Sequence, residues 1–461
     1  MKQHHLIFLT TAIFTVLFYE QSVGLNLGIF GLILSALVYC TTDRKVMNKT
    51  FYMLFAASVI SSLAFAWYGD VVSSLAVFFS LSLLIFCSQS ANMKPVFSLI
   101  VIPINAVSFI VRIFQFDKWL PKSQNNSNLW EKLFAYLIVP LALVVVFFLV
   151  YSFGSEHFKN VLVNWKWDIN IWQIILMAAL GFYLMFNFWN YAVSEYLEKQ
   201  SGLFCNDFKE TPDTEKSTFS FINIDMERTS GIISFVCLNV LLLIFVITFN
   251  YEQFFENRSM YYELKADTHD RVNVVIFSIL MAIVLIMFYF RGGFNFDKKA
   301  KWIKILAKIW ILLNVALVFS AFIKNTEYIY ETDMLTYKRL GVYAFLILSL
   351  IGLFFTFVKI QNKKTNAYLF NKMFWYFYGV LLVCSFINWG GIVTRYNITR
   401  SNFDIDYHIH QIDYNETILL KYAKEEDDKE KVIDAIYDLH INELQAKFLS
   451  KKLYYETLDL Q

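Results

Sequence analysis

Charge is scarce in this sequence. Only 17% of the 461 residues are Asp, Glu, Lys or Arg, whereas 57% are hydrophobic and the mean hydropathy is +0.48. Soluble domains are roughly 45–50% apolar. A soluble fold of this size cannot bury such an excess, so lipid must be the solvent for much of the chain. This excludes a cytoplasmic enzyme, a secreted disulfide scaffold and a disordered chain.

Cysteine, glycine and proline are also few. The five cysteines form no CxxC pair, which argues against zinc and redox motifs. With 15 Gly and 5 Pro, the broken helices of many secondary transporters are not expected. The net charge is +2 and no basic run alternates with aromatic residues, so nucleic acid is not an expected partner. No histidine lies inside an apolar stretch, which excludes a membrane-buried haem or iron site, and no cofactor is predicted.

What the chain does contain is a series of apolar stretches, and a helix needs about 20 residues to cross a bilayer. We therefore expect an all-α, polytopic transmembrane helix bundle. The first stretch has no small-residue cleavage site after it, so we interpret it as a retained span. The stretches lie at about 6–19, 23–40, 51–67, 71–90, 95–116, 133–153, 169–192, 231–249, 272–290, 302–323, 340–358 and 373–392.

The distribution of Lys and Arg decides the predicted orientation, because these residues accumulate in cytoplasmic loops. With the C-terminal tail left out of the count, the inner side holds 22 of them and the outer loops 8 if 95–116 lies along the inner surface; if it crosses, the numbers are 13 and 17. The first arrangement gives about eleven spans and one interfacial helix. We expect a bacterial inner (cytoplasmic) membrane protein with its N-terminus in the cytoplasm and its C-terminal tail outside.

This topology divides the chain into segments. They are a four-span bundle (1–94), an interfacial helix with an inner loop (95–131), a seven-span bundle (132–392) and an outer tail (393–461). The seven-span bundle contains a long acidic inner loop (193–229) and an aromatic, charged outer loop (250–271). The tail is predicted to be helical from about Glu416, and its apolar stripe consists of Val432, Ile436, Leu439, Leu444, Phe448 and Leu453.

The richest set of polar residues lies at the outer ends of the last four spans, in segments 268–273, 324–339 and 388–407. Because consecutive spans are usually neighbours, these segments are expected to form one charged surface, which we call the outer platform. It could bind an anionic headgroup, a glycan or a protein. It could equally be a salt-bridged lid that holds the tail, since surface charges usually pair or stay solvated. Its candidate binding residues are His269, Arg271, Asn325, Thr336, Lys338, Arg339, Asn388, Arg395, Asp404 and Asp406.

Signals for chemistry are weak. His408 and His410 stand two residues apart beside Asp404 and Asp406, and on a strand both rings would share a face suited to a metal. A solvated juxtamembrane segment explains the same residues, and no metal site is predicted. Ionisable residues deep inside spans mark transport pathways. The polar residues inside the predicted spans are instead mainly asparagines, which usually hold helices together.

The segments THDRVN (268–273), RGGFNF (291–296), LTYKRLGVY (335–343) and INWGGIVTRYN (387–397), followed by DIDY (404–407), resemble an uncharacterised bacterial family. This is the multi-pass membrane family grouped as domain of unknown function 4153/4173, common in Bacteroidetes. The resemblance is strongest over residues 230–410 and implies a polytopic membrane protein without an established activity. Some members carry a carotene-oxygenase label, which the absence of a four-histidine cluster does not support. Gly390 replaces the acidic residue usual at its position in the family.

Three hypotheses for function follow. The leading one is a non-enzymatic accessory, sensor or scaffold protein, embedded in the lipid bilayer, that binds a protein partner through the outer platform and tail or through the acidic inner loop. The second is a transporter or lipid-handling protein with a site at the outer ends of the last four spans and a polar cavity that reaches the midplane. The third is a membrane enzyme, whose candidate residues would be Asp404, Asp406, His408 and His410.

Overall fold

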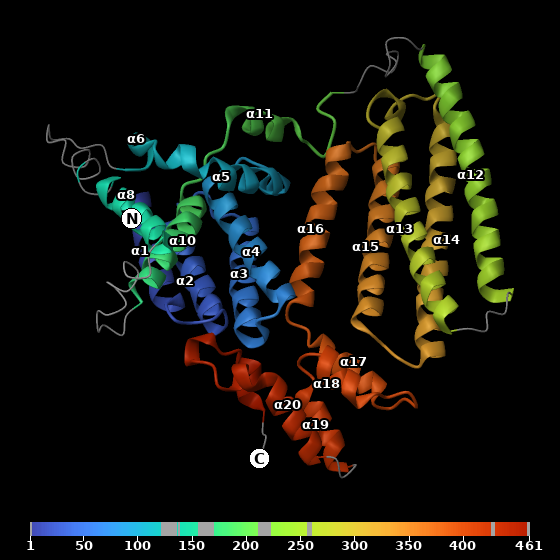
Figure 1. The fold of residues 1–461 in the computed structure, drawn as a ribbon. Helices are drawn as coiled ribbons and strands as arrows, with labels where there is room; N and C mark the ends of the chain where they lie inside the picture. The colour runs from blue at the N-terminus through green and yellow to red at the C-terminus, as the bar shows by residue number, and fades with distance from the viewer. Residues whose placement is uncertain are drawn as a thin grey trace. The chain divides into compact units, whose positions relative to one another are not determined.

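The structure is a computed structural model that describes residues 2–120, 136, 139–154, 170–210, 223–255, 261–425 and 429–458. Helices and short turns are the only regular elements in these ranges (Figure 1). The first half contains α1 (Gln3–Phe18), α2 (Leu25–Thr41), α3 (Lys49–Tyr68), α4 (Val71–Gln89), α5 (Ser98–Ile113), α6 (Phe116–Trp119), α8 (Val139–Gly154), α10 (Ile171–Trp189) and α11 (Glu195–Leu203).

The second half contains five long helices and a helical tail. The long helices are α12 (Ile224–Phe255), α13 (Tyr261–Tyr289), α14 (Lys301–Thr332), α15 (Tyr337–Gln361) and α16 (Asn366–Cys384). The tail consists of α17 (Trp389–Asn397), α18 (Ile405–Gln411), α19 (Glu416–Glu425), α20 (Lys429–Leu444) and the short turns η4 (Phe448–Ser450) and η5 (Leu453–Thr457); η1 (Pro95–Phe97) and η3 (Gly293–Asn295) lie earlier in the chain.

Within the described ranges, nine helices are long and apolar enough to cross a membrane, and the shorter α1 and α2 are also apolar. They coincide with the apolar stretches of the sequence, which confirms the expected helical membrane bundle. Several helices are longer than the predicted spans. In these places α12 ends at Phe255, α13 begins at Tyr261 and α14 ends at Thr332, and the short helix α11 lies within the predicted inner loop 193–229. Glu, Lys and Tyr residues in these segments are compatible with a helix, so α12, α13 and α14 extend beyond the ends of their apolar stretches.

The described chain forms two compact units. The first comprises Met1–Ser22 and Ile102–Ala192, and in it α1 packs along α10. A Cβ at Gly181 would come within 2.7 Å of the Phe14 ring, so glycine allows the two helices to approach closely. The indole nitrogen of Trp189 donates to the Thr10 hydroxyl at 3.1 Å, which fixes the register.

The second unit comprises Val23–Val101 and Val193–Gln461, and it begins with three helices held together by small residues. A Cβ at Gly31 would lie 2.3 Å from the Ser62 hydroxyl oxygen, so α2 and α3 meet almost backbone to backbone. The Ser35 hydroxyl of α2 donates to Ser58 of α3 at 2.9 Å. Small residues and hydroxyl hydrogen bonds are the usual means of joining helices in lipid, where apolar contact alone gives no preference for a neighbouring helix.

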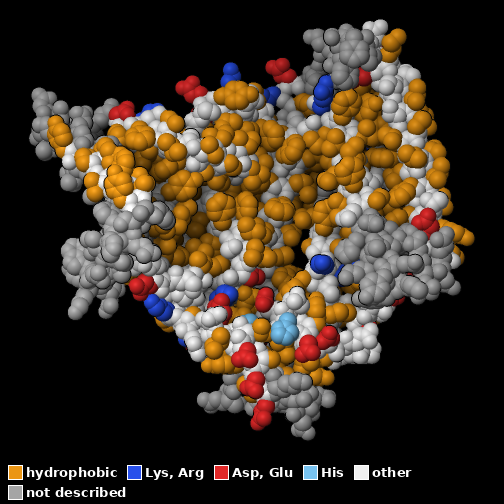
Figure 2. Space-filling model, viewed as in Figure 1, with side chains coloured by type: hydrophobic (Ala, Val, Ile, Leu, Met, Phe, Trp, Pro, Cys, Tyr) orange, Lys and Arg blue, Asp and Glu red, His pale blue; other side chains and the backbone are white. Residues whose placement is uncertain are grey.

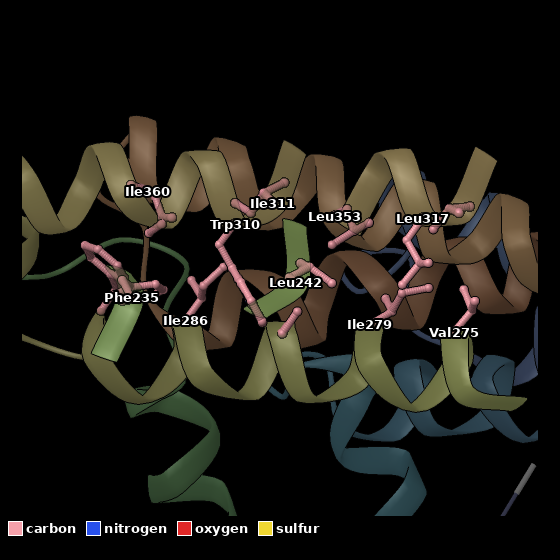
Figure 3. Close-up of a cluster of buried hydrophobic side chains, with 14 of the residues drawn as sticks. Phe235, Leu242, Val275, Ile279, Ile286, Trp310, Ile311, Leu317, Leu353 and Ile360 are labelled. Carbon is pink, nitrogen blue, oxygen red and sulfur yellow. The ribbon is translucent and has the colours of Figure 1, made fainter. Parts of the chain in front are cut away.

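In the same unit, α12, α13, α14 and α15 enclose a continuous hydrophobic core, shown in Figure 3. It runs from Phe235 and Ile286 through Trp310 to Leu317 and Leu353. The α16 helix packs against both α15 and α4, and the hydroxyls of Tyr378 and Ser80 lie 2.8 Å apart across the second of these contacts.

Amides in these helices bind backbone carbonyls and neighbouring helices, as the sequence predicts. Asn239 of α12 donates to the Leu306 carbonyl of α14 at 3.0 Å, and Asn314 of α14 accepts from Ser278 of α13 at 3.3 Å. One cation is fully buried here. Lys359 donates to the Phe290 carbonyl at 2.6 Å, just past the end of α13. The C-terminal end of a helix carries partial negative charge, which stabilises a cation there.

The tail is helical from Glu416, as predicted, but the residues of the predicted apolar stripe do not all lie on one buried face. Val432 and Ile436 are buried against Leu419, Leu420 and Ala423 of α19. Leu439 and Phe448 are instead 42% and 69% exposed. The predicted stripe requires a continuous helix, whereas α20 ends at Leu444 and the chain continues through the turns η4 and η5.

Candidate functional site

The outer platform separates into a buried part and an exposed part. In the buried part, Asn325 of α14 donates to the Arg339 carbonyl at 3.2 Å, and the Arg339 guanidinium lies 3.6 Å over the Tyr328 ring. Arg339 is only 3% exposed. A guanidinium on an aromatic face gains cation–π stabilisation. These residues therefore hold α14 and α15 together and are not available to a ligand.

Asn397, at the end of α17, is the centre of the next layer. Its side-chain oxygen accepts from the Leu335 N–H at 2.8 Å, and its amide nitrogen donates to the Leu335 carbonyl at 2.9 Å. The same nitrogen lies 2.9 Å from Nε2 of His408 in α18. One side chain thus joins the turn before α15, the end of α17 and the middle of α18. Because Asn397 and His408 are buried, these bonds fix the positions of the three elements.

Asn388 and Asn415 complete this polar layer. The Asn388 side chain caps α17 by accepting from the Gly391 N–H at 2.7 Å and donates to the Tyr414 carbonyl at 2.8 Å. Asn415 donates to the Thr394 hydroxyl at 2.8 Å and to the His408 carbonyl at 2.9 Å. This layer therefore consists mainly of neutral amides. One ion pair of the predicted salt-bridged lid is also present, between Arg400 and Asp333 at 3.6 Å.

Gly390 has a structural explanation. A Cβ at this position would come within 1.8 Å of the Asp413 carbonyl oxygen and 2.8 Å of the Tyr337 hydroxyl. An acidic side chain of the kind usual at this position in the resembling family has no room here, because the chain after α18 occupies that space.

Four charged residues of the platform remain exposed: Lys338 on the first turn of α15, Arg395 on α17, and Asp404 and Asp406 at the start of α18. Asp404 caps α18 by accepting from the Tyr407 N–H at 3.1 Å. Thr336 directly precedes α15, and its carbonyl accepts from the Arg339 N–H. His269 and Arg271 belong to α13, and their side chains lie outside the described residues.

The neighbouring histidines His408 and His410 do not form a metal site. They lie on helix α18 and not on a strand, so residues two apart point in different directions. His408 is fully buried, with Nε2 against Asn397 and Nδ1 2.7 Å from the Asp404 carbonyl, whereas His410 is exposed. Burial lowers the pKa of His408, so the neutral ring is favoured. Among the described residues, no group of three or more His, Cys, Asp or Glu side chains could hold a metal ion.

A second buried polar cluster joins α19, α20 and η5 within the tail, and no sequence motif predicted it. Glu416 is 1% exposed, and its carboxylate lies 2.9 Å from Nε2 of His440. Tyr455 packs on the His440 ring with centroids 4.8 Å apart. Burial, reinforced by the Glu416 charge, raises the pKa of Tyr455, so its phenol stays protonated. Glu416 and His440 are 24 positions apart, and no motif spacing connects them.

Backbone contacts complete the attachment of the tail. The Tyr414 hydroxyl donates to the Tyr68 carbonyl at the end of α3 at 2.6 Å, and the Leu25 N–H at the start of α2 donates to the Lys451 carbonyl at 2.8 Å. The tail therefore contacts the start of α2, the end of α3, the start of α15 and the end of α16. Figure 2 shows acidic side chains gathered on the tail, whereas the long helices carry mainly hydrophobic ones.

The acidic inner loop is described in part. The Thr365 N–H donates to the Asn206 carbonyl at 3.1 Å, and Lys364 forms an ion pair with Asp207, so the segment after α11 is attached to the turn between α15 and α16. Arg228, on the first turns of α12, binds Asp297 through two nitrogens at 2.8 and 3.0 Å. Asp207 and Arg228 are thus engaged within the protein.

Residues 27–417 match the family described as a domain of unknown function (DUF4153). The chain therefore belongs to this family, and it is a helical membrane protein of unestablished activity. The match ends at the start of α19, so most of α19, α20, η4 and η5 lie beyond it. Comparisons with curated proteins and with solved structures gave no match.

Proposed function

We propose that this protein is a non-enzymatic membrane component that binds a protein partner through the exposed charges around its tail. The observation that carries the proposal is the arrangement around Asn397. This side chain joins three elements, and each of them presents a charged residue to solvent close to its end: Lys338, Arg395 and Asp404. Binding surfaces require exposed groups on a rigid, hydrogen-bonded support, and this arrangement supplies both.

The transporter alternative receives less support. It requires a polar cavity that reaches the midplane, but the described core of α12–α15 consists of interlocking hydrophobic side chains (Figure 3). The asparagines in these helices already bind carbonyls or hydroxyls. They are used for helix packing, which leaves few groups to recognise a substrate.

We also propose that the tail lies on the outer side of a bacterial inner membrane. In the predicted topology, the start of α2, the end of α3, the turn between α14 and α15 and the end of α16 all emerge on the outer side. The tail contacts every one of these four places; at the last of them, the Trp389 indole donates to the Cys384 carbonyl at 3.0 Å. The alternation of spans and the packing of the tail are therefore mutually consistent.

The test is a double variant, Lys338→Ala with Arg395→Ala, in the full-length protein extracted gently from its native membrane. Both residues are exposed, so the fold should remain intact. The matched control is Lys298→Ala with Lys299→Ala, which removes two exposed charges at the turn between α13 and α14. Native mass spectrometry should show a stoichiometric partner on the wild type and the control and at least a tenfold loss on the double variant.

Two outcomes overturn the proposal. One is a wild-type protein that carries no protein partner, and the other is a partner retained equally by both variants. Arg339→Ala is unsuitable for this test, although Arg339 was a candidate binding residue. Its side chain is buried on Tyr328, so a loss of binding would report a loss of folding.

A further inference from the structure

Helix α5 is polar on the inside and apolar on the outside. Asn105 and Arg112 are buried, at 2% and 7% exposure. The opposite face exposes Ile104, Val107, Ile110 and Val111, of which Val107 is 83% exposed. A helix on a water-facing surface has the reverse pattern. The outer face of α5 therefore requires lipid.

The buried face of α5 is attached to the end of α10. Asn105 donates to the Ala192 carbonyl and accepts from the Ala192 N–H, both at 2.9 Å. Arg112 binds the Asn190 carbonyl and the Asn187 side chain. The last carbonyls of a helix carry partial negative charge and lack partners within the helix. The Arg112 guanidinium provides both a positive charge and hydrogen-bond donors at this end of α10.

The contacts of α5 do not progress along α10. The Arg112 guanidinium folds back along α5 and donates to the Asn105 carbonyl at 3.1 Å, so its long side chain, and not its backbone, reaches Asn187 and Asn190. The backbone is located by Ala106, whose carbonyl accepts from the Tyr183 hydroxyl at 3.3 Å. Phe109, about one turn further on, packs on the same Tyr183 and on Phe186 at 4.9 and 5.3 Å. A helix that crossed the bilayer beside α10 would shift its contacts steadily toward the other end of α10.

The next helix returns to the same place. Trp119 of α6 packs on Phe182 and Phe186 with centroids 6.2 and 5.4 Å apart, and its indole nitrogen donates to the Ile113 carbonyl at 3.1 Å. Lys118 beside it is exposed. Trp119 itself is buried, at 6% exposure, and packs inside the protein. An exposed Lys beside a membrane helix is typical of the headgroup region.

We propose that α5 and α6 lie in the plane of the membrane, within the leaflet that holds the end of α10, with the apolar face of α5 among the lipid acyl chains. Arg112 and Asn105 form a polar seam against the end of α10, and the exposed Lys118 lies at the headgroups. This places Asn92 and Lys118, which flank the two helices, on the same side of the membrane, and it does not depend on the proposed function.

Sidedness is the first test. Single cysteines at Asn92, Lys118 and Thr399, all exposed, are introduced into a full-length variant that lacks the five native cysteines and elutes as a single species. A membrane-impermeant maleimide is added to sealed right-side-out and inside-out vesicles. N92C and K118C should label from the same side and T399C from the other. Labelling of K118C together with T399C, opposite N92C, means that α5 crosses and overturns the proposal.

Depth is the second test. A nitroxide attached at Val107→Cys should be relaxed mainly by oxygen, which concentrates in the acyl region, and one at Lys118→Cys mainly by a water-soluble nickel chelate. Equal exposure of both labels to the nickel chelate would show that α5 faces water, which overturns the proposal even if the sidedness is as expected.

Discussion

Replacing Asn397 with Ala should detach part of the tail while leaving the membrane helices folded. The Asn397 side chain makes the hydrogen bonds to the Leu335 N–H, the Leu335 carbonyl and the His408 ring. Leu335 and His408 are themselves buried. Removing the amide therefore leaves three polar groups without partners in a site that water enters poorly.

The magnitude follows from these groups. A buried donor or acceptor left without a partner costs about 1–3 kcal/mol, and partial relaxation reduces the total for three groups to about 3 kcal/mol. Since about 1.4 kcal/mol is a factor of ten in an equilibrium constant, the population with an open tail should rise about 100-fold. The effect stays local because α12–α15 have a core of their own.

Limited trypsin digestion in detergent micelles measures this opening. Arg395 and Lys421 are exposed but helical, so cleavage there requires local unfolding. Cleavage in the tail should accelerate by one to two orders of magnitude in Asn397→Ala and hardly at all in Thr399→Ala, an exposed position two residues further on. If the tail of Asn397→Ala is cleaved less than about threefold faster than that of the wild type, the amide layer does not hold the tail and the reasoning fails.

Three further predictions concern single positions. Gly390→Ala should destabilise the tail by more than about 3 kcal/mol, because its Cβ would come within 1.8 Å of a carbonyl oxygen, whereas Gly341→Ala, with open space, should be neutral or stabilising in thermal unfolding. Burial lowers the pKa of His408, so its contribution to stability is complete above the unfolded-state pKa of about 6.5 and is lost as the pH falls toward the folded-state pKa; the unfolding midpoint of the tail should drop between pH 7.5 and 5.5. Asp297→Ala should cost about 2–3 kcal/mol in thermal unfolding, because Arg228 loses a charged partner at a mostly buried site.

The controls for the last two predictions use exposed neighbours. His410→Gln should keep the pH dependence of the tail and His408→Gln should reduce it; equal pH dependence in the two variants contradicts the role of His408. Lys298→Ala should unfold like the wild type. A midpoint for Asp297→Ala that also equals that of the wild type would show that the pair with Arg228 is not stabilising.

The sequence predicted the candidate site only in part. Its segments, 324–339 and 388–407, do pack together, because they follow or precede consecutive spans. Which of their residues are exposed could not be predicted. Arg339 and Lys338 are adjacent in the chain, yet one lies under an aromatic ring and the other faces solvent. That difference depends on the direction of the first turn of α15, which packing against α14 sets.

By itself, the sequence determined the class of this protein and the location of its spans. Twenty-residue apolar stretches have only one stable form in lipid, the helix, since every backbone polar group must be paired within the segment. Tertiary structure alone decided the rest. Asn397 bonds to Leu335 across 62 positions, Tyr414 to Tyr68 across 346, and Glu416 approaches His440 across the tail. Such pairs depend on which helix ends lie next to one another in the fold, and no periodicity in the sequence indicates this.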